Sequence, residues 1–316
     1  MLSLPSHRGV FLIAGVLACA ACGYLAPDPP AELFGRLPAG QALYLYLDGD
    51  RLRASEALGP LLEAGLGQRD EYSEFAEATG VDYRRDVDAV ALSLGPDEIF
   101  VAARGRIAEP ALRQYLAAKG AYCSGSLRQS PCALVLAESG ARLRFEMPAA
   151  DVVTIHQATR AGAITGSTKR PADGRALSWL ARERLARGAL LWAMIDPGGL
   201  ERAMRDPPAG LVNLTVVARA LEKSQRAFLY AVPYDDGGLA LTLEASCPGE
   251  SEAAELRSLL AGLNSFGAAL ADTGKQGVTS EWGKVLQSAR FTREKSSVLA
   301  VWRVNQDLLR GLAAPR

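Results

Sequence analysis

The side chains that could carry acid–base or nucleophilic chemistry are few in this chain. It contains two histidines among 316 residues, and only His156 lies beyond the first 21 residues. A Ser-His-Asp or Cys-His arrangement would depend wholly on His156, which stands in a predicted strand with no cysteine or acidic residue beside it. No G-x-S-x-G turn accompanies it, and no H-E-x-x-H motif occurs. We therefore predict that His156 is a packed or surface residue of a strand and that the chain is not an enzyme.

Asp48 and Asp50 flank a glycine directly after an apolar stretch. This pattern resembles the nucleophile motif of the haloacid-dehalogenase-like phosphatases, in which one Asp attacks phosphorus and the other acts as acid and base. The Thr or Val and the apolar residue that should follow are replaced here by Leu52 and Arg53. An Asp between a strand and a helix also caps the helix, and we prefer this interpretation. A hydrolase would need His156, Asp48 and Asp50 to converge on one pocket.

No other segment has the spacing that a cofactor or metal site requires. Gly274-Lys275 resembles the end of a phosphate-binding loop, but Ala269 stands where the first glycine of that loop should be. Asp235-Asp236 is followed by no series of alternating calcium ligands, and a hairpin turn explains it. We predict no metal and no cofactor.

Three cysteines lie in the body of the chain. Cys123 and Cys132 flank a polar loop rich in Ser, Gly and Pro, which favours a disulfide bond in an exported protein. Two separate thiols are the alternative, and a zinc site is disfavoured because no second cysteine pair exists. Cys247 ends an apolar strand pattern and is expected to be unpaired and buried.

The N-terminal segment indicates export. A positive charge at Arg8, an apolar run at residues 10–21 and small residues before Cys22 are typical of a signal peptide at residues 1–21, too short to span a bilayer. The end of this run resembles the lipobox of bacterial lipoproteins, which implies an acylated cysteine: Cys22, or alternatively Cys19. An ordinary signal peptide cleaved near Ala20 or Ala21, with no role for either cysteine, is a further alternative. Residues 22–31 would then form the lipid anchor and a stiff, proline-rich tether.

Composition excludes some partners. Lys plus Arg and Asp plus Glu both number 35, so the formal net charge is zero, and no block of like charge stands out. A nucleic-acid binder would need a basic stripe, and binding to anionic lipid would need a basic patch. We therefore expect no nucleic acid as partner, and membrane attachment through acyl chains only.

The body divides into two stretches with the same order of predicted elements. Apolar strands at 42–48 and 190–196 both end in Asp and are followed by two helical patterns, a strand hairpin and a helix. We predict an α+β fold of two β-α-α-β-β-α repeats at residues 32–170 and 171–316, with mostly antiparallel sheets covered by helices. The polar segment 165–174 is the predicted boundary. Further strands are expected at 133–137, 142–146, 152–156 and 297–304, and further helices at 280–288 and 306–312.

The first strand of each repeat is apolar on both faces. Tyr44 and Tyr46 alternate with leucines, and Trp192 and Met194 occupy the matching positions of the second repeat. A central strand covered on both sides explains this pattern. Alternatively, these four side chains line a cleft between the repeats in which an apolar ligand or peptide is bound.

Residues 37–55, LPAGQALYLYLDGDRLRAS, resemble the opening strand of a group of poorly characterised bacterial lipoproteins and secreted proteins. The resemblance continues over most of the body and implies no particular activity. We therefore expect a lipid-anchored, non-catalytic interaction module of the cell envelope, facing the periplasm or the cell exterior. A carrier of a small apolar ligand or peptide in a cleft between the repeats is the alternative function.

Overall fold

The computed structural model describes residues 29–56, 58–59, 70–136, 140–158, 188–203, 218–234, 237–272 and 280–313. Cys19, Cys22 and the predicted boundary at 165–174 lie outside these ranges, as does the signal segment. Predictions about those residues therefore stay predictions.

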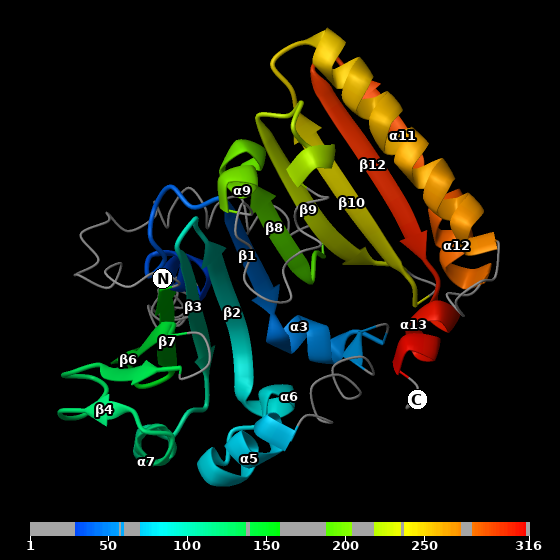
Figure 1. Cartoon of the computed structure of the whole chain (residues 1–316). Helices are drawn as coiled ribbons and strands as arrows, with labels where there is room; N and C mark the ends of the chain where they lie inside the picture. The colour runs from blue at the N-terminus through cyan, green and yellow to red at the C-terminus, as the bar shows by residue number, and fades with distance from the viewer. Residues whose placement is uncertain are drawn as a thin grey trace, which may run out of the picture.

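The structure combines helices with one large antiparallel sheet, which confirms the predicted fold in this general form (Figure 1). Within the described ranges twelve strands pair in the order β11-β12-β10-β9-β8-β1-β2-β3-β7-β6-β5-β4. A single sheet thus runs through both halves of the chain. The strands are β1 Leu43–Asp48, β2 Val87–Leu94, β3 Glu98–Gly105, β4 Tyr122–Cys123, β5 Cys132–Val135, β6 Arg142–Ala149, β7 Val152–Ala158, β8 Leu191–Ile195, β9 Arg226–Pro233, β10 Leu239–Ser246, β11 Arg290–Glu294 and β12 Ser297–Val304.

The antiparallel pair β1–β8, near the middle of the sheet, joins the two halves. To one side of this pair the order continues β2-β3-β7-β6, and to the other side β9-β10-β12-β11 (Figure 1). Alternation gives the sheet two faces. The leucine face carries Leu45 and the side chains in register with it, such as Leu92 and Ile155, whereas the tyrosine face carries Tyr44 and Tyr46.

Different helices cover the two faces of the sheet: α7 and α11 lie on the leucine face, and α2 lies on the tyrosine face. The helices are α2 Pro29–Phe34, α3 Gly49–Ala54, α5 Asp70–Thr79, α6 Tyr83–Asp86, α7 Glu109–Ala118, α9 Pro197–Ala203, α11 Glu250–Asp272, α12 Ser280–Gln287 and α13 Gln306–Ala313. On the leucine face, α7 packs over the strands of the first half, and α11 buries Leu256 and Leu260 in a cluster with strand residues of the second half. The long α11 lies along β12 in Figure 1.

The tyrosine face is covered at its centre by α2. Leu33 and Phe34 of α2 are fully buried in one cluster with Tyr44 and Tyr46. The sequence predicts an extended tether up to residue 31, and this is wrong from Pro29 onward, where the structure begins a helix. Proline suits the first turn of a helix, since its missing N–H has no partner there in any case.

Candidate ligand-binding pocket

The three residues that a hydrolase would require do not meet. Asp48 caps α3, with its Oδ1 accepting a hydrogen bond from the Arg51 backbone N–H at 3.0 Å, and exposed Asp50 pairs with Arg53. The strand register places His156 in line with Tyr44, four residues before Asp48 along β1. At about 3.3 Å per residue this separation is roughly 13 Å. Asp48 is thus a helix cap at the end of β1, and His156 on β7 lies near the level of the opposite end of β1.

His156 instead has a buried partner that sequence inspection missed. Its Nε2 lies 3.1 Å from Oε2 of Glu98, and Gln41 Nε2 donates a hydrogen bond to Oε1 of the same carboxylate at 2.9 Å. The His156 and Glu98 side chains are only 11% and 10% exposed, which leaves little room for a substrate to reach them. The network therefore ties the start of β1 to β3 and β7 on the tyrosine face.

The aromatic side chains expected to line a cleft are core residues. Trp192 is 0% exposed, Tyr46 2% and Tyr44 5%, and Met194 is partly buried against the same cluster. The ring of Phe34 from α2 lies 5.8 Å from that of Trp192, measured between centroids. The predicted cleft at these residues is thus wrong, because α2 occupies the space in which a ligand would lie.

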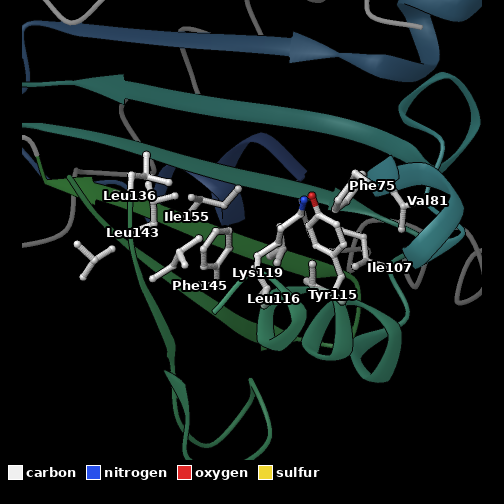
Figure 2. Close-up of a pocket in the computed structure, with 14 residues that line it drawn as sticks. Phe75, Val81, Ile107, Tyr115, Leu116, Lys119, Leu136, Leu143, Phe145 and Ile155 are labelled. Carbon is white, nitrogen blue, oxygen red and sulfur yellow. The ribbon is translucent and has the colours of Figure 1, made fainter. Parts of the chain in front are cut away.

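A different apolar pocket lies on the leucine face, between α7 and strands β5–β7 (Figure 2). Its volume is about 530 Å³, within the range of about 300–1,000 Å³ that small-molecule sites occupy. We call this cavity the α7 pocket. Its lining is almost wholly apolar and comprises Phe75, Val81, Ile107, Leu112, Tyr115, Leu116, Lys119, Leu134, Val135, Leu136, Leu143, Phe145, Val153 and Ile155.

The strands supply one wall of the α7 pocket and the helices the other. Leu143 and Ile155 extend from β6 and β7 toward α7, as Figure 2 shows. On the helical side, the rings of Phe75 and Tyr115 meet edge to face at 5.3 Å between centroids, which joins α5 to α7. The rim continues onto the surface, where Val135 is 61% exposed. The α7 pocket therefore has an apolar interior and an apolar entrance.

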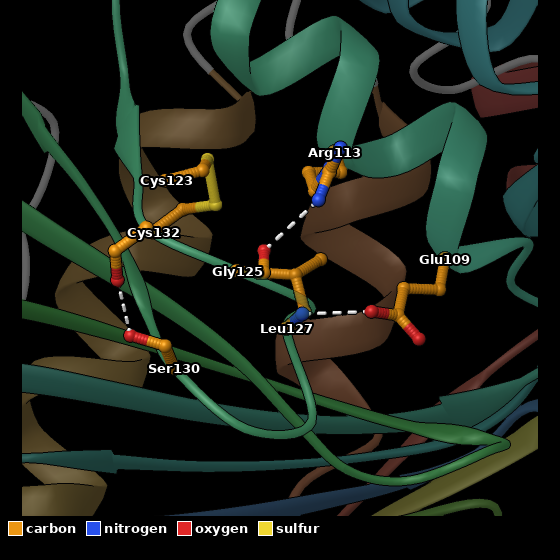
Figure 3. The surroundings of a disulfide bond; sticks show 8 residues. Glu109, Arg113, Cys123, Gly125, Leu127, Ser130 and Cys132 are labelled. Atoms are coloured by element: carbon orange, nitrogen blue, oxygen red, sulfur yellow. Dashed lines mark hydrogen bonds between the residues drawn. A yellow bond between two sulfur atoms is a disulfide. The ribbon is translucent and has the colours of Figure 1, made fainter.

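A disulfide bond between Cys123 and Cys132 fixes the strand wall, which confirms the predicted pairing (Figure 3). It joins β4 to β5, and β5 continues into the pocket residue Leu134. The loop between the cysteines is held to α7, since the Leu127 N–H donates to Glu109 Oε1 at 2.7 Å and Arg113 donates to a loop carbonyl. The disulfide bond and α7 thus hold β5 in place beside the pocket.

A carboxylate network holds the helical wall. Asp82 accepts hydrogen bonds from Tyr72 Oη and from Nε and Nη2 of Arg84, each at 2.8 Å. The hydrogen bonds from Arg84 are the main reason that the pKa of Asp82 lies well below its usual range, with burial opposing them and Tyr72 assisting. Because Val81 lines the α7 pocket next to Asp82, this network fixes a pocket residue.

Among the described residues that line the α7 pocket, one side chain is charged. Lys119 follows the end of α7, and its Nζ lies 2.6 Å from Glu74 Oε2 and 5.6 Å from the centroid of the Tyr115 ring. Its side chain is 41% exposed, so the amine is accessible to water. In Figure 2 the polar ends of Lys119 and Tyr115 point to the same part of the pocket. A ligand in the pocket would thus have its polar end near these two groups.

A second apolar surface lies on α11. Leu259, Leu263 and Phe266 are 40%, 46% and 64% exposed and follow the i, i+4, i+7 spacing of one helix face. Residues 258–271 include no charged side chain. Cys247, in contrast, is free and buried as predicted, and burial raises the pKa of its thiol.

Within the described ranges, no helix is both long and apolar enough to cross a membrane. The same part of the chain holds no group of three or more His, Cys, Asp or Glu side chains arranged for a metal ion. No protein-family model matches the chain, and neither the curated proteins nor the solved structures give a significant match.

Proposed function

We propose that this protein is an exported, lipid-anchored, non-catalytic binding protein of the bacterial cell envelope that holds an apolar chain in the α7 pocket. The observation that carries the proposal is the pocket itself, a cavity of about 530 Å³ whose described lining residues include one charged side chain. Hydrocarbon walls without partner atoms lose dispersion contacts, and a ligand restores them. Binding of an apolar ligand is therefore favourable, and the bound ligand stabilises the pocket.

The size of the driving force suits reversible binding. Burying one methylene group contributes about 0.8 kcal/mol, so a chain of about ten methylene groups contributes about 8 kcal/mol before the cost of ordering it. A dissociation constant of about 1 μM corresponds to about 8 kcal/mol. After the ordering cost, we expect affinities in the micromolar range or weaker, which allow both loading and release.

The location of His156 supports a non-catalytic role. The α7 pocket lies on the leucine face, lined by Val153 and Ile155 of β7, whereas His156, the residue after Ile155, points to the tyrosine face. The buried pair of His156 and Glu98 is therefore separated from the pocket by the sheet. Asp48 and Asp50 are engaged with Arg51 and Arg53.

The proposed anchor supplies a source of ligand. If Cys22 is acylated, six residues (23–28) separate it from Pro29 at the start of α2. A chain spans at most about 3.6 Å per residue, so α2 stays within roughly 25 Å of the bilayer surface. Lipid chains in the membrane are then close to the protein. Cys19 as the acylated residue would lengthen this tether by three residues, or at most about 11 Å.

We also propose that the body arose by duplication, as two β-α-α-β-β-α units at residues 32–170 and 171–316. The strand order supports this, since β2-β3-β7-β6 beside β1 corresponds to β9-β10-β12-β11 beside β8. α7 follows β3 as α11 follows β10. The ligand site would then belong to the first unit alone.

A partner protein is the second candidate for the bound molecule. The exposed stripe of Leu259, Leu263 and Phe266 on α11 favours it, because an apolar helix face with this spacing fits a groove in a partner. The absence of charge at residues 258–271 requires that groove to be apolar. A photo-crosslinking residue at Leu263 should then yield one adduct of defined mass in the native envelope, and one at Leu299 should yield none.

The ligand proposal is tested by photolabelling of the full chain in phosphatidylcholine vesicles with a long-chain alcohol that carries a diazirine. Peptide mass mapping should place the label on α7 and on β5–β7. The variant Leu143→Trp fills the pocket from its strand wall and should lose this label. The control Leu299→Trp, at a leucine of β12 that is 36% exposed, should keep it. Labelling that is spread over the surface, or equal in both variants, would contradict the proposal.

A further inference from the structure

We infer that the ligand of the α7 pocket is a long-chain carboxylate, a fatty acid, whose chain lies among the apolar residues and whose head group binds to Lys119. This inference rests on the proposed function and specifies its ligand. It follows from the chemistry of the few polar atoms in the wall.

The polar atoms of the lining are mainly donors. The Lys119 amine has three N–H donors and no acceptor, and the Tyr115 hydroxyl adds one O–H. A carboxylate offers only acceptors and carries the opposite charge to Lys119, so it matches both groups. A hydroxyl head group can accept a hydrogen bond from the Lys119 amine but carries no opposite charge, and an amine head group is repelled.

The position of Lys119 matches the shape of an amphiphile. Its amine is partly exposed, while Leu116, one turn earlier on α7, is 2% exposed in the interior. A fatty acid bound with its head at Lys119 keeps the carboxylate near water and buries the hydrocarbon. The apolar entrance at Val135 and Leu136 then contacts the hydrocarbon chain of the fatty acid and not its head group.

Glu74 sets the strength of this interaction. Its carboxylate lies 2.6 Å from the Lys119 amine but does not line the pocket. A ligand carboxylate therefore has to share Lys119 with Glu74 or displace Glu74 from Lys119. Either event lowers the affinity for the ligand. Removing the negative charge of Glu74 should strengthen binding of a fatty acid and leave binding of a fatty alcohol unchanged.

The test compares palmitic acid with hexadecanol as competitors of the diazirine alcohol, using the full chain in phosphatidylcholine vesicles at pH 8. We expect palmitic acid to compete at about tenfold lower concentration than hexadecanol, because only its carboxylate carries the charge opposite to that of Lys119. Lys119→Gln should abolish this preference, Lys119→Arg should retain it, and Glu74→Gln should enlarge it. The control Lys223→Gln, which removes the lysine paired with Glu255 in the second half, should change nothing.

The outcomes separate this inference from the function on which it rests. If both competitors act equally and Lys119→Gln has no effect, the pocket binds apolar chains and the carboxylate inference is overturned. If neither competitor displaces the label from α7 and β5–β7, the proposed function itself fails. A preference for palmitic acid that persists in Lys119→Gln would also overturn the assignment of the head group to Lys119.

Discussion

Tyr46 of β1 lies directly opposite Trp192 of β8 in the strand pair near the middle of the sheet. Both side chains are at most 2% exposed, and both contact Phe34 of α2, with ring centroids 5.9 Å and 5.8 Å away. The two halves of the chain and the N-terminal helix therefore share one aromatic cluster. This cluster stabilises the join between the halves, and it leaves no space for a ligand.

Truncating Trp192 should strongly destabilise the protein. Trp192→Ala removes a fully buried ring and leaves a cavity under α2, for which we expect a loss of about 3–5 kcal/mol in the free energy of unfolding. Urea denaturation of the purified full chain measures it. Tyr122→Ala, at an aromatic residue that is 75% exposed, is the matched control and should change stability by less than about 0.5 kcal/mol. Equal losses in the two variants would contradict the buried join.

The disulfide bond should stabilise both the fold and the α7 pocket. Replacing Cys123 and Cys132 together with Ser removes a cross-link across nine residues of sequence separation, which costs about 2–3 kcal/mol in the chain-entropy model. Because β5 carries Leu134 into the pocket, photolabelling of α7 should fall as well. Cys247→Ser, at the free buried cysteine, should leave the labelling intact. Unchanged labelling in the double variant would show that the pocket wall does not depend on the disulfide bond.

Stability should depend on pH through Asp82. The pKa of this carboxyl is lower in the folded protein than the value of about 4 expected in the unfolded chain, so the unfolded chain binds more protons in acid. The stabilisation is therefore present above pH about 4 and is lost as the pH falls below it.

Asp82→Asn isolates this contribution. We expect it to cost about 1–3 kcal/mol at pH 7, with the difference from wild type shrinking as the pH falls from 4 toward 2. Urea denaturation at several pH values measures it. Asp50→Asn, at a side chain that is 70% exposed, should show no such trend. A difference that stays constant with pH would exclude the charge of Asp82 as its origin.

Two glycines should respond oppositely to alanine. A Cβ on Gly105 would lie 1.9 Å from the backbone oxygen of Asp86, so Gly105→Ala should force the backbone apart and destabilise by more than about 1 kcal/mol. On α11, a Cβ on Gly262 meets no atom within 4 Å, and Gly262→Ala should stabilise by about 0.5–1 kcal/mol through helix propensity. Thermal denaturation of both variants compares them. A stable Gly105→Ala variant would contradict the close approach of β3 to residue 86.

Local patterns in the sequence predict much of the secondary structure. Period-two alternation predicts β1 and β12 within a residue or so, and helical periodicity predicts α12 and α13 equally closely. β4, with two residues, and α6, with four, are too short to give a period. β11 is missed because four of its five residues are polar or charged, as edge strands often are.

Long-range pairing explains the remaining errors. The sheet is continuous because β1 pairs with β8, which lies far along the chain. No local sequence pattern encodes that contact. The same holds for His156 and Glu98, which are 58 residues apart. The α7 pocket draws on residues from Phe75 to Ile155, and in the sequence its apolar lining residues have the pattern of core residues. More apolar residues occur near α7 than one core-facing side of each helix needs. This surplus could have indicated a site near α7, but not the volume of the pocket.

The most direct test of the account is native mass spectrometry of the full chain released from bacterial membranes in mild detergent. We predict that the wild type and Leu299→Trp each carry one non-covalently bound molecule with a long hydrocarbon chain per protein. Leu143→Trp should carry none. This bound mass is distinguished from a covalent anchor because it is lost on denaturation. A wild-type protein without bound lipid, or a Leu143→Trp variant that carries as much as Leu299→Trp, would contradict the assignment of the α7 pocket as a ligand site.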